Sequence, residues 1–189
     1  MPRVVDHDER RRTLALAACA VIARSGLAGA TMRDVAAEAG CTTGMVSHYF
    51  ADKDQLLVAA LGAATSAVAQ RITRTAAERP GDLVAVLAES LPLDDVRRRE
   101  WRVWTAFWGA AVGNPALARE HAARYARWRG GLATVLAEEP WAGAVHEDAA
   151  ETVMTAVDGI GLHAVFEPQL WPAERQLAHL NRVVEALKR

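Results

Sequence analysis

Apolar residues recur at helical spacing along almost the whole sequence. Leu14, Ala17, Ala18, Val21 and Ile22 follow one another at steps of three and four residues, the period that places side chains on one face of an α-helix. The same period returns in every later segment, and no run alternates convincingly with a period of two, as a half-buried strand would. The sequence therefore predicts an all-α fold.

Capping residues and helix breakers divide this pattern into segments. Gly26 is expected to stop the first helix, and Thr31 with Asp34 three residues later resembles a capping box. Thr42 and Asp52 are placed to cap the two helices that follow. After the first helix, we expect helices at residues 31–39, 43–49, 53–79, 82–90, 94 or 95–112, 116–137, 147–166 and 173–187.

Composition narrows the class of protein. Half of the chain is hydrophobic (51%), so a substantial core is expected, and the formal net charge of -1 argues against a protein coated in nucleic acid. Two cysteines do not make a disulfide framework. The polar stretch 1–12 does not look like a secretion signal, and the apolar runs are too interrupted to predict a membrane span. We expect a cytoplasmic protein without membrane contact.

The most informative segment is residues 31–57, where two short helices are joined by a tight turn. Gly40 suits a left-handed turn position, and Val35 and Val46 are spaced to pack the two helices together. This is the pattern of a helix-turn-helix, whose short second helix enters a DNA major groove about 12 Å wide. An ordinary helical hairpin in a core is the alternative, but the turn, the cap and the polar second helix coincide here.

The second helix carries small and polar residues that suit contact with DNA. Hydroxyls of Thr and Ser bond phosphates or base edges, and a glycine lets the backbone approach the duplex. A lysine at the next helix start is placed for a phosphate, because free backbone N–H groups there also favour an anion. The candidate DNA contacts are Thr42, Thr43, Gly44, Ser47, His48, Tyr49 and Lys53.

The segment from Thr31 to Leu56 resembles the tetracycline-repressor (TetR) family. Its Thr-Met-Arg-Asp-Val-Ala-Ala-Glu-Ala-Gly helix, its Thr-capped second helix and its Tyr-Phe-Ala-Asp-Lys-Asp-Gln-Leu continuation match that family's pattern. Ser47, where many members have Tyr, makes it similar to the subgroup of the choline-responsive BetI-type repressor. The strong resemblance covers about residues 10–60, and a weaker one covers residues 156–163 and the last helix.

The resemblance implies a larger organisation. It implies about nine helices, with a helix-turn-helix domain at residues 1–55 and an effector-binding and dimerisation domain at residues 56–189. It also implies a homodimer formed through the last two helices, a palindromic operator as DNA partner, and release by a small-molecule effector. Arg33 and the Arg10–Arg12 cluster would lie near the flanking phosphates.

An aromatic stripe marks a candidate effector pocket in the second half of the chain. Its members could equally be simple core, but as a group they suit an apolar or flat ligand, or a cation such as choline through cation–π attraction. The candidate ligand residues are Trp101, Trp104, Phe107, Trp108, His121, Tyr125, Trp128 and Asp158. Two glycines inside one helix, Gly159 and Gly161, suggest close approach of a second helix at a dimer seam.

Other function classes find little support. The sequence has no Gly-rich phosphate loop, no Cys-x-x-Cys or His-x-x-x-His pair and no Gly-x-Ser-x-Gly elbow. We therefore expect neither an enzyme nor a bound cofactor or metal. A helix-turn-helix that docks a protein partner stays open as a third hypothesis.

Overall fold

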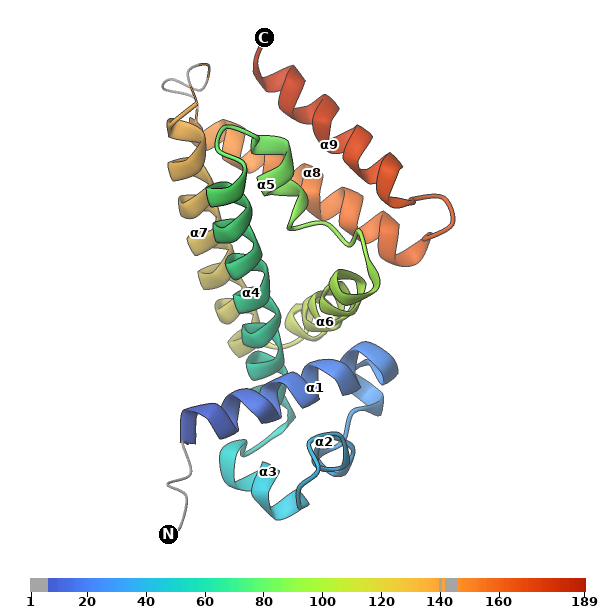
Figure 1. Cartoon of the computed structure of the whole chain (residues 1–189). Helices are drawn as coiled ribbons and strands as arrows, with labels where there is room; N and C mark the ends of the chain where they lie inside the picture. The colour runs from blue at the N-terminus through green and yellow to red at the C-terminus, as the bar shows by residue number, and fades with distance from the viewer. Residues whose placement is uncertain (1–6, 140, 142–145) are drawn as a thin grey trace.

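The computed structural model describes residues 7–139, 141 and 146–189, and every regular element within them is a helix. Figure 1 shows three N-terminal helices at one end of the molecule, with the long α4 leading away from them beside α7. The helices are α1 His7–Gly29, α2 Met32–Glu38, α3 Thr43–Tyr49, α4 Lys53–Glu78, α5 Leu83–Ala88, α6 Asp95–Val112, α7 Pro115–Ala137, α8 His146–Phe166 and α9 Ala173–Leu187. The all-α prediction is confirmed.

Side-chain caps set the helix starts where the sequence predicted them. Thr31 accepts from the backbone N–H of Asp34, whose carboxylate accepts in turn from the Thr31 N–H, so the capping box is present. Thr42 caps α3 and Asp52 caps α4 in the same way. Gly26 interrupts α1 with a φ of 66°, a left-handed backbone that explains the predicted stop.

The first core joins α1, α2 and α3 to the start of α4 and to α6. Val35, Val46 and Phe50 are fully buried there with Leu57 of α4 and Phe107 of α6. By length and composition alone, α1 and α4 could each cross a membrane, but both contribute apolar residues to this core, as the core helices of a globular domain do. Helix α4 begins before residue 55 and packs its first turns into this N-terminal core. The domain division predicted at residue 55 stays a prediction.

The second core lies between the C-terminal helices. Leu91, Leu136, Val153, Leu180 and Val184 are buried together in it. The helices α8 and α9 form an antiparallel pair that packs against α7 and α5 (Figure 1). Helices α6 and α7 contribute buried residues to both cores, and α4, α6 and α7 line the space between the cores.

Gly161 serves a different purpose from the predicted dimer seam. The six-membered ring of Trp101 from α6 lies so close to Gly161 that any Cβ there would overlap it. The indole N–H of Trp101 donates to the Ser90 carbonyl at 2.9 Å, which fixes the ring. The neighbour that requires a glycine at position 161 is thus Trp101 of the same chain. Gly159 is exposed, and a Cβ there would meet no other atom.

Replacing Gly161 with Ala is expected to lower the free energy of unfolding by about 1–3 kcal/mol, the usual cost of overpacking a core. Gly130→Ala is the matched control: Gly130 is an exposed glycine of α7 with open space around it, and Ala should stabilise that helix by up to about 1 kcal/mol. Urea denaturation followed by circular dichroism measures both. Equal stability of Gly161→Ala and the native chain would contradict the contact with Trp101.

Candidate functional site

Helix α3 presents a small polar surface to solvent. Val46 is buried beneath it and Thr42 caps it, its hydroxyl accepting the Met45 N–H at 3.3 Å. The outward side, here called the α3 face, consists of the exposed residues Thr42, Thr43, Gly44, Ser47 and His48. These five predicted DNA contacts therefore lie together on one accessible helix, and Arg33 is exposed on the neighbouring α2.

Tyr49 and Arg11 fix the end of α3. The Tyr49 hydroxyl lies 3.0 Å from Nδ1 of His7, and its ring meets the edge of His48. Arg11 donates from Nη1 to the Tyr49 carbonyl at 3.0 Å, and its guanidinium lies 4.8 Å above the Phe50 ring. Arg11, predicted near flanking phosphates, thus ties α1 to the C-terminus of α3.

Lys53 forms hydrogen bonds within the chain. Its ammonium donates to the carbonyls of Leu27 and Ala28 at 3.1 and 3.2 Å, at the end of α1. The sequence predicted a phosphate contact for this residue, and the structure commits two of its three N–H donors elsewhere. The pairing joins residues 26 positions apart, so no local pattern could have indicated it.

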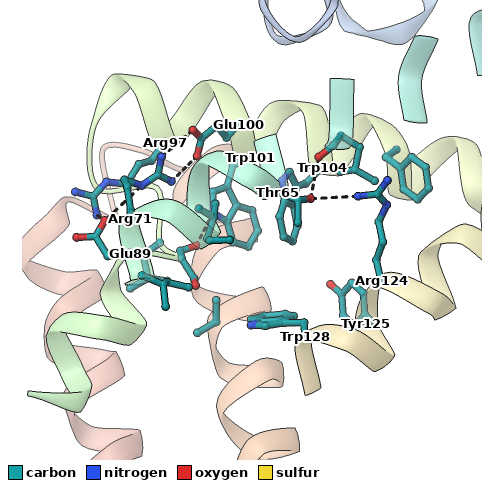
Figure 2. Close-up of a pocket in the computed structure, with 18 of the residues that line it drawn as sticks. Thr65, Arg71, Glu89, Arg97, Glu100, Trp101, Trp104, Arg124, Tyr125 and Trp128 are labelled. Atoms are coloured by element: carbon teal, nitrogen blue, oxygen red, sulfur yellow. Dashed lines mark hydrogen bonds and ion pairs between the residues drawn. The ribbon is translucent and has the colours of Figure 1, made fainter. Parts of the chain in front are cut away.

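A partly open cavity of about 230 Å³ lies between the two cores. Its walls come from α4, α6 and α7, and Figure 2 shows the side chains converging on it. Of the predicted ligand residues, seven line the cavity: Trp101, Trp104, Phe107, Trp108, His121, Tyr125 and Trp128. We call this space the aromatic cavity.

Indole rings form flat walls in the aromatic cavity. Trp101 and Trp104 are stacked with ring centroids 6.1 Å apart, and Trp128 meets Trp104 edge-on at 6.4 Å. Burial lowers the pKa of His121, which favours its neutral form. This part of the wall is thus apolar and aromatic.

One end of the aromatic cavity is closed by an ion-pair network that sequence reasoning missed. Arg71 donates to both carboxylate oxygens of Glu100 at 2.9 and 2.6 Å, and Arg97 pairs with Glu89 at 3.1 Å (Figure 2). The hydrogen bonds that Arg71 donates to Glu100 raise the pKa of the guanidinium. Arg71 and Glu100 are 29 positions apart in the sequence, so periodicity gave no sign of the network.

Asp158 lies behind the wall rather than in it. It does not line the aromatic cavity but a more open hollow of about 480 Å³, whose other lining residues include Trp108, His121 and Tyr125. The Tyr125 hydroxyl donates to Asp158 Oδ2 at 2.8 Å. Burial raises the pKa of Asp158 to about 6, and burial beside Asp158 also raises the pKa of Tyr125. Asp158 thus lies outside the aromatic cavity and supports Tyr125, and its predicted ligand contact stays a prediction.

Metal binding finds no geometric basis in the part of the chain that the structure describes. Within it, no group of three or more His, Cys, Asp or Glu residues is arranged to hold an ion.

Family models match both halves of the chain. Residues 15–60 match the family described as bacterial regulatory proteins, tetR family. Residues 80–189 match the C-terminal family of the BetI-type transcriptional repressor. The first match covers the α3 face and the second covers most of the aromatic cavity.

Similar proteins agree with these models. The chain is 31% identical over 192 residues to the transcriptional regulator BetI of Paraburkholderia phymatum, covering 99% of this chain and 97% of that one. A transcriptional regulator from Rhodococcus sp. Rha1 has a similar structure, with a TM-score of 0.82, 34% identity and coverage of 94% and 95%. The multidrug binding protein EbrR, complexed with ethidium, has a TM-score of 0.69, 30% identity and coverage of 94% and 99%.

Asp158→Asn is expected to change how stability depends on pH. The folded carboxyl has a pKa near 6 against an ordinary 3.8, so it binds its proton more tightly when folded. Its contribution to stability is full below about pH 4 and is lost as the pH rises to about 6. Asn does not titrate and still accepts a hydrogen bond from Tyr125. The free energy of unfolding of Asp158→Asn should therefore rise relative to that of the native chain, by on the order of 2–3 kcal/mol between pH 4 and 6.

Urea unfolding at steps between pH 4 and 7.5 measures this difference. A constant difference across that range would show that Asp158 is not the buried acid described here.

Proposed function

Because the chain belongs to the TetR family of bacterial transcriptional regulators, we propose that it is a repressor released by a small molecule. As a dimer it binds a palindromic operator through the α3 face, and an effector in the aromatic cavity lowers its affinity for DNA. The observation that carries this proposal is the exposed polar α3 face on a short, firmly anchored helix. Proteins of this family are regulators and not enzymes, and a cytoplasmic location follows from that role.

The α3 face suits the major groove in size and chemistry. Thr43, Ser47 and His48 offer donors and acceptors on one side of a two-turn helix, as base-edge recognition requires. Arg33 and Tyr49 flank it and are placed for phosphates. Lys53 contributes chiefly by holding α1 against α4 and acts on DNA through that support.

The dimer is proposed to form through α8 and α9. Exposed apolar residues follow α8 at helical spacing, with Leu162 exposed by 38% and Phe166 by 71%, and Gly159 lies one turn earlier on the same side. Such a stripe on the surface of one chain indicates a covered interface. Two-fold symmetry through this face would present two α3 helices to one duplex.

Release from DNA is proposed to be a shift between two dimer geometries. An effector that binds one geometry better draws the population toward it. Support for a small aromatic effector comes from the indole walls, and from EbrR, which is similar over almost the whole chain and is complexed with ethidium in its structure. Helix α4 joins the aromatic cavity to the N-terminal core and is the natural route between them.

Replacing Ser47 and His48 together with Ala is expected to weaken operator binding at least about tenfold, since each base contact contributes about 1–3 kcal/mol. The DNA is a duplex that the native chain selects from a random library, and affinity is read by fluorescence anisotropy. Ser66→Ala with Gln70→Ala, both on an exposed side of α4, is the control and should bind normally. Unchanged affinity in the α3 variant would favour the protein-docking hypothesis.

Introducing Glu at Leu162 and Phe166 should convert the dimer into a monomer, because a charge buried in an apolar seam is not solvated. Light scattering after size-exclusion chromatography gives the mass directly. Val96→Glu, on an equally accessible apolar residue of α6 (52% exposed), should stay dimeric. Dimers in both variants would place the interface elsewhere.

A further inference from the structure

Paired charges close one end of the aromatic cavity, and we infer that the opposite end, at Arg124, holds the carboxylate of a ligand. The effector is then a flat aromatic acid of about two fused rings, bound through Arg124. This inference rests on the proposed function and specifies the ligand class that the cavity accepts.

Cavity size and walls set the shape of the ligand. A cavity of about 150 Å³ holds benzene, so 230 Å³ suits a body of about two rings. Trp101 and Trp104 lie nearly parallel, with 22° between their planes. Parallel indoles favour a planar molecule that packs in offset or edge-to-face contact with them.

The carboxylates that line the aromatic cavity are already committed. Glu100 is bound at both oxygens by Arg71, while Glu89 lies between Arg97 at 3.1 Å and Arg71 at 3.4 Å. A cationic ligand would therefore contact the aromatic rings but would find no free carboxylate to pair with. Among the described lining residues, four are arginines and only two are acidic.

Arg124 is a half-buried arginine of the cavity with unspent donors, whereas Arg127 is exposed. It reaches from α7 to the cavity end opposite the ion-pair network (Figure 2), and its side chain is only 18% exposed. Nη1 lies 3.5 Å from Thr65 Oγ1, and Nε lies 2.7 Å from Glu120 but makes no aligned hydrogen bond. A guanidinium has five N–H donors, so a carboxylate can bind two of them side by side.

The same residue connects ligand and α4. Arg124 contacts Thr65 of α4, and its Nη2 lies close to the position that a Cβ on Gly62 would occupy. A carboxylate that draws the guanidinium toward itself loosens this long contact. Occupancy is thus reported to the helix that leads into the N-terminal core.

The test compares three naphthalene probes that differ only in their polar group: 2-naphthoate, 2-naphthamide and 2-naphthylmethylammonium. Isothermal titration calorimetry on the full chain without DNA gives each Kd. We expect 2-naphthoate to bind most tightly. Arg124→Gln should weaken its binding about tenfold or more, the effect of losing a charged hydrogen-bond donor, and leave the ammonium probe within twofold.

Arg119→Gln is the matched control, since Arg119 is exposed on the same helix and does not line the cavity. Thermal unfolding by circular dichroism verifies that both variants fold. Tighter binding of the ammonium probe, no binding of 2-naphthoate at millimolar concentration, or equal effects of the two variants would overturn the inference. The calorimetry contains no DNA, so a negative result for the probes does not bear on operator binding. A negative result for operator binding likewise leaves the probe affinities unchanged.

Discussion

The whole arrangement depends on the packing of one uninterrupted helix, α4, against two different sets of partners. Its first turns bury Leu56, Leu57 and Leu61 in the core shared with α1 and α3. Further along, Thr65 and Ile72 line the aromatic cavity, where Arg71 is held by Glu100. A hydrogen-bonded helix moves as a unit, so a displacement at the cavity also acts on the N-terminal core.

Two basic residues make that connection tight. Lys53, the first residue of α4, bonds the carbonyls at the end of α1, while Arg11 of α1 bonds the last carbonyl of α3. Both charges would be expected on a DNA-facing surface, yet each is used to hold helices together. Helix α3 is therefore positioned by α1 and α4 jointly, and a small shift of α4 can reorient it.

Sequence reasoning succeeded where the signal is local. Caps at Thr31, Thr42 and Asp52 act within three residues, and the aromatic stripe follows from helical period alone, so helix starts and most of the cavity wall were predictable. It failed where the partner is distant: Gly161 accommodates Trp101, 60 positions away, and periodicity carries no such pairing. Asp158 is a related case, because the rotation of α8 decides that Val157 and not Asp158 lines the aromatic cavity.

The central claim is that α4 transmits occupancy of the aromatic cavity to the two α3 helices of the dimer. A distance measured across the dimer tests it most directly. A spin label at Ala37→Cys, exposed on α2, in a chain with Cys19→Ala and Cys41→Ser, allows pulsed electron resonance with and without the tightest-binding naphthalene probe. The account predicts that the distance shifts by several ångströms as operator affinity falls. An affinity that falls while the distance stays the same would contradict it.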